Sequence, residues 1–163
     1  MKFIFIVFNF ILICILNINN LYGQENTDFN IGYYDLNNDV RYDIWGVHPV
    51  DIRSNTNQLF KRPIAGAELG LKDIKPFQRM AKVKFKLLNK RIKENQNNAE
   101  LIYEHIKENK IKFILLDFPS AEIIKIMERI VDLNITAINV SSKNNDLRSS
   151  KYIKNLFHTI PSE

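Results

Sequence analysis

Small hydroxyl side chains follow three apolar runs of this sequence, close to the point where each run ends. Ser120 comes after residues 111–116 and a short turn, Ser141 and Ser142 come after residues 135–140, and Thr159 comes after Leu156 and Phe157. Hydroxyl groups both donate and accept hydrogen bonds. If the three runs are strands of one parallel sheet, their ends meet at one edge, and the sequence predicts a site there that binds a polar solute.

Ser120 stands at the expected start of a helix. The free N–H groups and partial positive charge of a helix N-terminus can hold an anion or a polar ligand atom. The simpler alternative is that Ser120 or Asp117 caps this helix. We expect capping as the minimum role, with a ligand contact in addition if the chain is a binding lobe.

Aromatic side chains cluster after the first expected strand, at Tyr34, Tyr42 and Trp45. Tyr34, Tyr42 and Trp45 could form an apolar wall at the mouth of a binding site. A small surface cluster that closes the connector on itself is an equal alternative.

Catalytic motifs are missing, since the sequence contains no GxSxG, GxxxxGK or GxGxxG. Four aspartates share one connector without the spacing of a metal-binding loop, and three histidines are dispersed. We therefore expect a protein that is not an enzyme and that has no metal and no cofactor. The residues considered are Asp35, Asp39, Asp43, Asp51, His48, His105 and His158.

Apolar runs alternate with segments of helical period. Strands are expected at residues 30–35, 82–88, 111–116, 135–140 and 155–159, with helices at 63–77, 98–109 and 120–133. Such alternation predicts βαβ units, hence an α/β fold with a doubly wound parallel sheet. Residues 82–88 alternate charged and apolar side chains, which favours an edge strand. The helix from Pro63 is expected to pack inward through Ile64, Ala67, Leu71, Ile74 and Phe77.

The first 23 residues have the layout of a secretory signal peptide: Lys2, an apolar run at 3–16, and a polar stretch that leads to Gly23. We expect cleavage near Gly23, so that residues 24–163 form the mature domain; a retained N-terminal anchor is the alternative. Cys14 is the only cysteine, and the bulky Leu12 and Ile13 before it disfavour lipid attachment. The chain has 163 residues with 45% hydrophobic side chains, which fits one domain. Its net charge of +5 is spread along the chain and does not indicate nucleic-acid binding.

Five segments of the sequence together resemble the N-terminal lobe of type I periplasmic solute-binding proteins. They are IGYYDLNNDVRYD, RPIAGAELGLKDI, KFILLDFPSAEII, INVSSKNNDLRSS and NLFHTIPSE. The chain looks most like the ABC transporter substrate-binding protein associated with the PQQ-dependent alcohol dehydrogenase system. The resemblance implies an exported, periplasmic protein whose partners are a small solute, an ABC transporter permease in the membrane and a PQQ-dependent dehydrogenase. Such proteins have two lobes, so we expect this chain to correspond to the first lobe and to stop before the second.

In amino-acid-binding relatives, the loops after the third, fourth and fifth strands hold the ligand, and these correspond here to Ser120, to Ser141 with Ser142, and to Thr159. The first of these loops departs from the family, because Asp117 stands where relatives are rich in Gly and Ser. A carboxylate there would repel a ligand carboxylate and favour a cation or a hydroxyl donor. The alternative functions are a non-transport protein that docks on a periplasmic dehydrogenase or receptor and, more distantly, an enzyme of flavodoxin-like fold.

Overall fold

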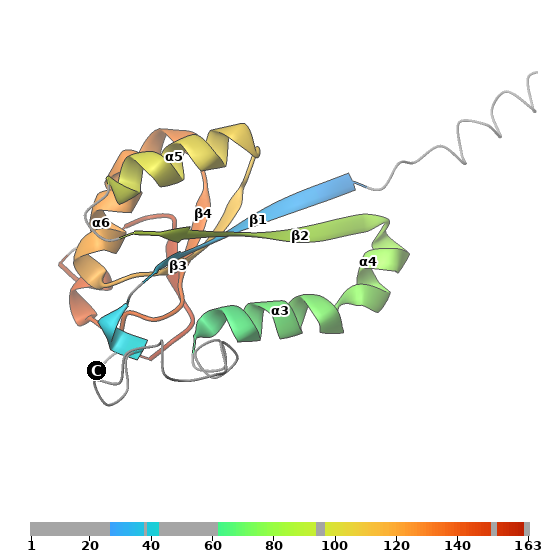
Figure 1. The fold of residues 1–163 in the computed structure, drawn as a ribbon, viewed down its shortest axis with the longest axis horizontal. Coiled ribbons are helices and arrows are strands. Elements are labelled where there is room, and N and C mark those ends of the chain that lie inside the picture. The colour runs from blue at the N-terminus through green and yellow to red at the C-terminus, as the bar shows by residue number, and fades with distance from the viewer. Residues whose placement is uncertain (1–26, 38, 43–61, 94–96, 151–152, 162–163) are drawn as a thin grey trace, which may run out of the picture.

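The apolar runs form one parallel five-stranded sheet in this computed structural model, which describes residues 27–37, 39–42, 62–93, 97–150 and 153–161 (Figure 1). The strand order is β2-β1-β3-β4-β5, and every pairing is parallel. The strands are β1 (Thr27–Leu36), β2 (Val83–Ile92), β3 (Phe113–Asp117), β4 (Thr136–Asn139) and β5 (Leu156–His158). The predicted α/β class and the edge position of the second strand are confirmed.

Helices lie on both sides of the sheet, with α5 and α6 on one side and α3 and α4 on the other (Figure 1). Their bounds are α3 (Pro63–Asp73), α4 (Lys75–Ala81), α5 (Asn98–Glu108) and α6 (Ser120–Arg129). Three short 3-10 helices are η1 (Val40–Tyr42), η2 (Val131–Leu133) and η3 (Asn145–Leu147). In the described part of the chain, no helix has the length and apolar character needed to cross a membrane.

The core lies between the sheet and the α5–α6 pair. Ile102 and Ile106 of α5 are buried one turn apart, and Ile123 and Ile126 of α6 are buried in the same way. They pack against alternate residues of the strands, which point to the same face. These strand residues include Ile114, Leu116, Ala137 and Leu156.

Gly32 permits a close approach within β1. A Cβ atom at this position would lie 2.6 Å from Cε2 of Tyr34, whose ring lies over the same face two residues along the strand. Tyr34 is fully buried, and its hydroxyl is 3.0 Å from Nδ1 of His105 on α5. The missing side chain at Gly32 thus makes room for the tyrosine ring that joins β1 to α5.

The prediction of one core-packed helix from Pro63 is wrong. The helix is interrupted at Ile74, one residue before the Lys75–Pro76 pair, because proline lacks an N–H and its ring clashes with the preceding turn. Ile64 is the one buried residue of α3, and α4 has no buried residue. Ile74, which lies between the two helices, and Phe77 of α4 are both exposed. Periodicity placed these side chains on one helix face with Ile64, but only the start of this face is covered, and Ile74 and Phe77 lack a covering element among the described residues.

Candidate functional site

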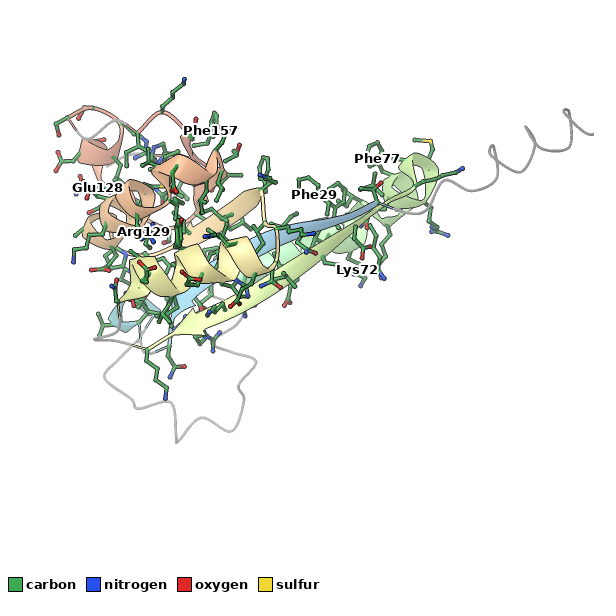
Figure 2. The ribbon with its side chains drawn as sticks, turned by 90° about the horizontal axis from the view of Figure 1, so that it is seen from above. Phe29, Lys72, Phe77, Glu128, Arg129 and Phe157 are labelled. Atoms are coloured by element: carbon green, nitrogen blue, oxygen red, sulfur yellow. The ribbon has the colours of Figure 1, made fainter. Side chains whose placement is uncertain are left out.

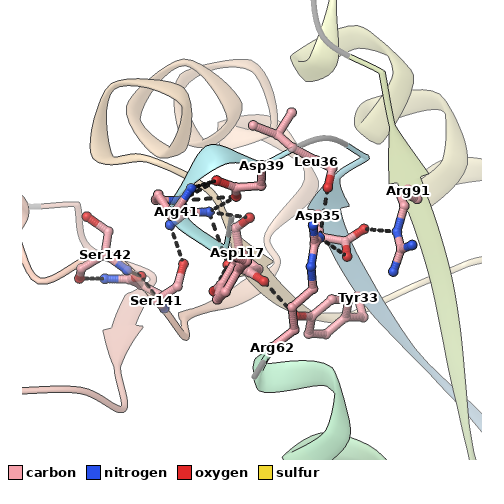
Figure 3. Close-up of polar contacts among 12 residues, drawn as sticks. Tyr33, Asp35, Leu36, Asp39, Arg41, Arg62, Arg91, Asp117, Ser141 and Ser142 are labelled. Atoms are coloured by element: carbon pink, nitrogen blue, oxygen red, sulfur yellow. Dashed lines mark hydrogen bonds and ion pairs between the residues drawn. The ribbon is translucent and has the colours of Figure 1, made fainter. Parts of the chain in front are cut away.

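Aspartates lie at the carboxyl ends of β1 and β3, at the same level of the sheet. Asp35 pairs with Asp117 in the parallel register of these strands, and both side chains are fully buried. Two adjacent buried carboxylates repel each other and require cationic or hydrogen-bonding partners. Arginine and tyrosine side chains provide these partners (Figure 3). We call this side of the sheet, at the ends of β1, β3, β4 and β5, the carboxyl edge.

Two arginines bind Asp35. Arg62, just before α3, donates from Nη1 to Oδ2 at 2.9 Å and to the carbonyl of Leu36 at 2.8 Å, and Arg91 of β2 donates from Nε to Oδ1 at 3.2 Å. Burial raises the pKa of Asp35, although the charges and hydrogen bonds of Arg91 and Arg62 act in the opposite direction. The ion pairs thus join α3 to the two neighbouring strands.

Asp117 is held by two tyrosine hydroxyls and one arginine. Tyr33 donates to Oδ2 at 2.9 Å, Tyr42 donates to Oδ1 at 2.7 Å, and Arg41 donates from Nη2 to Oδ1 at 3.1 Å. Burial, with the hydrogen bond and charge of Asp117, raises the pKa of Tyr33 and of Tyr42 above the ordinary tyrosine value. Both tyrosines therefore remain neutral donors to the carboxylate at physiological pH.

Arg41 connects three segments at the carboxyl edge. Its Nε donates to both oxygens of Asp39 at 2.9 and 3.0 Å, its Nη2 also pairs with Asp39, and its Nη1 donates to Oγ of Ser141 at 2.8 Å. Nη2 donates in addition to the backbone carbonyl of Asp117 at 3.0 Å. Burial acts to lower the pKa of Arg41, but the hydrogen bond and charge of Asp39 and the charge of Asp117 outweigh it, so the pKa rises. One permanently charged side chain thereby ties η1 to the ends of β3 and β4.

Asn139, the last residue of β4, shapes the loop that follows. Its buried side-chain Oδ1 accepts the N–H of Ser141 at 3.2 Å and of Ser142 at 2.8 Å, and its Nδ2 donates to the carbonyl of Ser142 at 2.6 Å. Nδ2 also lies 3.0 Å from Nδ1 of His158 on β5. Its backbone carbonyl accepts from the N–H of Thr159 at 3.2 Å and from its hydroxyl at 3.4 Å. Asn139 therefore fixes the hydroxyl-bearing residues of two strand ends relative to each other.

Ser120 joins the same edge through a different contact. It is the first residue of α6, and its Oγ accepts from Nδ2 of Asn144, in the loop after β4, at 3.1 Å. Neither Ser120 nor Asp117 caps α6, contrary to our expectation. The capping position belongs to Pro119, whose carbonyl accepts from Glu122 and Ile123, and Asp117 is instead occupied by its tyrosine and arginine partners.

The carboxyl edge presents hydroxyl groups of graded exposure. Ser120 and Ser141 are half-buried, Thr159 is exposed, and Ser142 is buried. A hydroxyl has one donor and two acceptor positions, so each group can bind a ligand in addition to the neighbour that orients it. Within the described ranges, no group of three or more His, Cys, Asp and Glu residues is arranged to hold a metal ion. The arrangement supports hydrogen bonding to a polar molecule.

The sequence matches no protein-family model and no curated protein. Two solved structures have a similar fold. The first is an ABC transporter substrate-binding protein from Desulfitobacterium hafniense, with 17% identity and a TM-score of 0.58. The second is the branched-chain amino acid transporter substrate-binding protein LivJ from Streptococcus pneumoniae, in complex with isoleucine, with 13% identity and a TM-score of 0.61.

Each of these alignments covers 83% of this chain and 34% of the other. The chain has the lobe fold of periplasmic binding proteins. It spans about a third of the length of the two structures that it resembles.

Within this lobe, the sequence-predicted residues fall into two groups. Ser120, Ser141, Ser142 and Thr159 all lie at the carboxyl edge, as their positions after apolar runs predicted. Tyr34 does not lie at a cleft mouth, because it points into the core under α5.

Two further expectations concern Trp45 and Asp117, which were predicted to lie near the ligand. Trp45 lies outside the described residues, and its predicted role stays a prediction. The expectation that the Asp117 carboxylate faces the ligand is wrong, since this group is buried and neutralised by its partners. A ligand carboxylate would therefore not meet a free negative charge at this position.

Sequence reasoning missed the residues that organise the lobe's edge, above all Arg41 and Asn139. Arg41 lies 100 positions from Ser141, so the contact depends on tertiary structure. Asn139 carried a signal, however, because it is a polar residue inside the apolar run ITAINV. A buried amide requires hydrogen-bond partners, and such a residue often shapes the backbone around it.

Proposed function

We propose that this chain is the solute-binding lobe of an exported ABC transport or sensing system, and that it binds a small polar solute at its carboxyl edge without chemical reaction. The observation that carries the proposal is the bonding of Asn139, which holds Ser141, Ser142 and Thr159 together at this edge. Open α/β sheets bind ligands outside the carboxyl ends of their strands. The edge thus combines the expected place with oriented hydroxyl groups.

Binding is favoured over catalysis by the partners of these hydroxyls. A serine nucleophile needs a neighbouring base that takes its proton. The Oγ of Ser141 instead accepts from the guanidinium of Arg41, which is a permanent cation and cannot take a proton. His105 and His158 are engaged by Tyr34 and Asn139. The hydroxyls are therefore positioned as ligand contacts.

The burial of Asp117 extends the candidate solutes from cations and hydroxyl donors to molecules that carry a carboxylate. Because its oxygens are bound by Tyr33, Tyr42 and Arg41, it does not oppose an anionic ligand group. We include amino acids and short carboxylates among the candidate solutes, beside alcohols. A link to PQQ-dependent alcohol oxidation belongs to this proposal and rests on the sequence resemblance; docking on a periplasmic dehydrogenase without solute transport is its alternative.

Export is part of the proposal, since the matched structures are ABC transporter substrate-binding proteins. We propose that the signal peptide at residues 1–23 is cleaved near Gly23 in the periplasm. Amino-terminal sequencing of the protein recovered from the periplasm tests this point. A mature chain that begins at Gln24 is expected, and recovery only of uncleaved chain from the membrane would favour the retained anchor.

A solute screen tests the binding function. Thermal unfolding of the protein is followed with branched-chain amino acids, short-chain alcohols and short carboxylates, and affinities of those that raise the Tm are measured by calorimetry. Ser141→Ala and Thr159→Ala should each weaken binding about tenfold, since a lost hydrogen bond costs about 1 to 1.5 kcal/mol. Ser149→Ala, in an exposed serine after η3, serves as the control. If no solute raises the Tm and the protein is retained by a periplasmic dehydrogenase, the docking alternative is correct.

A further inference from the structure

Apolar side chains are exposed at the end of the sheet away from the carboxyl edge, where α4 lies beside the start of β2. Leu69 is 58% exposed, Phe77 54% and Met80 78%. Figure 2 shows Phe77 and Lys72 at this end of the molecule, far from Phe157. We call residues 69–86 the basic tip. Isolated exposed apolar side chains are common, but several on one protruding element suggest a contact surface.

The basic tip carries an unusual share of the positive charge. Residues 72–86 contain six basic residues and one acid, Asp73, for a net charge of +5, which equals the +5 of the whole chain. The other residues of the protein are therefore neutral in sum. The basic residues of the tip are Lys72, Lys75, Arg79, Lys82, Lys84 and Lys86, of which all but Lys86 are exposed.

The fold holds this surface in a fixed orientation. Gln78 of α4 points inward, where its Oε1 accepts from the N–H of Phe85 at 3.0 Å and its Nε2 donates to the carbonyl of Leu71 at 3.3 Å. Lys82 ends α4 in the left-handed conformation, with a φ of 52°, and turns the chain into β2. With Gln78 bound to the strand, Phe77 and Met80 remain on the outer side of α4.

The sequence before β1 reaches the domain at the same place. The N–H of Thr27 donates to the carbonyl of Lys82 at 3.1 Å, so residue 27 lies beside the end of α4. The apolar run of the first residues ends at Leu16, and the ten residues 17–26 connect it to Thr27. Ten residues span at most about 35 Å. Before the expected cleavage near Gly23, a chain whose apolar run is inserted in the membrane would therefore hold the basic tip within reach of the lipid surface.

We propose that the basic tip docks on a membrane surface that bears anionic lipid headgroups. Lysine and arginine side chains would contact the headgroups, while Phe77, Met80 and Leu69 would enter the boundary between headgroups and acyl chains, as in interfacial amphipathic helices. Phe77 and Met80 of α4 and Leu69 of α3 are exposed within a basic segment, a combination that suits a soft lipid surface. This docking is separate from solute binding, because the tip and the carboxyl edge are at opposite ends of the strands.

Vesicle binding of the mature protein, which is expected to begin at Gln24, tests the proposal. Partition coefficients are measured by co-sedimentation with phosphatidylcholine vesicles and with vesicles containing about 30% phosphatidylglycerol, in low and high salt. Apolar contacts contribute to binding of both vesicle types, so the readout that isolates the anionic headgroups is the ratio of the two partition coefficients. Each basic residue at an anionic surface strengthens binding about fivefold. Loss of three such contacts lowers the ratio by about 100-fold, so the charge reversals Lys75→Glu, Arg79→Glu and Lys82→Glu in one variant should lower it by at least about that factor.

A control variant makes the same charge change elsewhere, at Lys93→Glu, Lys107→Glu and Lys154→Glu, which are all exposed. The control should keep most of the preference for phosphatidylglycerol. An equal loss in both variants would overturn the proposal, since it would show attraction by total charge alone. Circular dichroism confirms that each variant is folded.

A second variant tests the apolar contribution without a change of charge. Phe77→Ser with Met80→Ser should weaken binding to the phosphatidylglycerol vesicles about tenfold. Unchanged binding would contradict insertion of these side chains. Binding of the tip to polyglutamate, with no preference for phosphatidylglycerol, would instead indicate an acidic protein partner and overturn the lipid assignment. Solute binding should remain the same in every variant, so either proposal can fail alone.

Discussion

Replacement of Asn139 by alanine should both destabilise the lobe and disorganise its site. The side chain is fully buried and makes contacts with Ser141, Ser142 and His158. Alanine fills part of the space but satisfies none of these partners. The variant therefore isolates the contribution of one amide to the shape of the carboxyl edge.

The magnitude follows from the groups left without a partner. Ser142 is 8% exposed, so its N–H and its carbonyl both lose a partner in a buried position. Each such group costs about 1–3 kcal/mol, and loop relaxation or an entering water molecule recovers part of this. Ser141 and His158 are less buried and can be hydrated. We expect Asn139→Ala to lower the free energy of unfolding by about 3 kcal/mol.

Urea denaturation, followed by circular dichroism, measures this change. Asn89→Ala is the matched control, because Asn89 is an exposed asparagine in β2 and its loss should change the free energy of unfolding by less than about 0.5 kcal/mol. Solute affinity should also fall in Asn139→Ala, since the loop at Ser141 and Ser142 loses the amide that shapes it, whereas Thr159 keeps its bonds to the backbone carbonyl of residue 139. Equal stability of the two variants, or normal solute binding by Asn139→Ala, would refute the reasoning.

Three further predictions concern the strand end and the core. Arg62→Ala should lower the free energy of unfolding by about 3 kcal/mol, because it leaves the buried Asp35 with one guanidinium partner fewer. In a double-mutant cycle, the added change Asp35→Asn should recover part of this loss, since it removes the buried charge. Gly32→Ala should lower the free energy of unfolding by about 1–3 kcal/mol, because its Cβ would lie 2.6 Å from a buried tyrosine ring. Gly66→Ala, whose Cβ would have no atom within 4 Å, should instead raise it by about 0.5–1 kcal/mol through the better helix propensity of alanine. Equal effects of the two changes in denaturation would contradict the packing at Gly32. Burial, and to a smaller extent the charge of Lys90, lower the pKa of His105 in the folded protein. As the pH falls, the unfolded chain is therefore protonated at this histidine before the folded chain is. The contribution of neutral His105 to the free energy of unfolding is complete above about pH 6.5 and is lost as the pH falls through the folded-state pKa. In denaturation experiments between about pH 7.5 and 5, His105→Gln should therefore lose less stability than the wild type.

The sheet could be predicted from the sequence because a strand buried on both faces of a parallel sheet is a continuous apolar run. Residues 111–116 and 135–140 have this character and correspond to β3 and β4. The helix from Pro63 could not be predicted in the same way. Its period shows which side chains share a face, but not whether another element covers that face, and Ile74 and Phe77 remain exposed.

The positions of the site hydroxyls followed from topology, since parallel strands place their following loops at one edge. The contacts that orient them could not be deduced, because Arg41 and Ser141 are brought together by the pairing of distant strands. A weaker signal was present at the aspartates, since YYD and LLD both end an apolar run with Asp35 and Asp117. Two such endings predict adjacent carboxylates once the strands are known to pair, and hence a need for cationic partners.

The proposed function requires that a solute binds at the carboxyl edge. The most direct measurement is the shift of backbone amide signals in a ¹⁵N–¹H NMR titration with the solute that raises the Tm most. We expect the largest shifts at Ser120, Ser141, Ser142 and Thr159, with smaller changes elsewhere. Shifts centred instead on the opposite end of the sheet, in the open cavity lined by Asp28, Asn30 and Asn109, would contradict it.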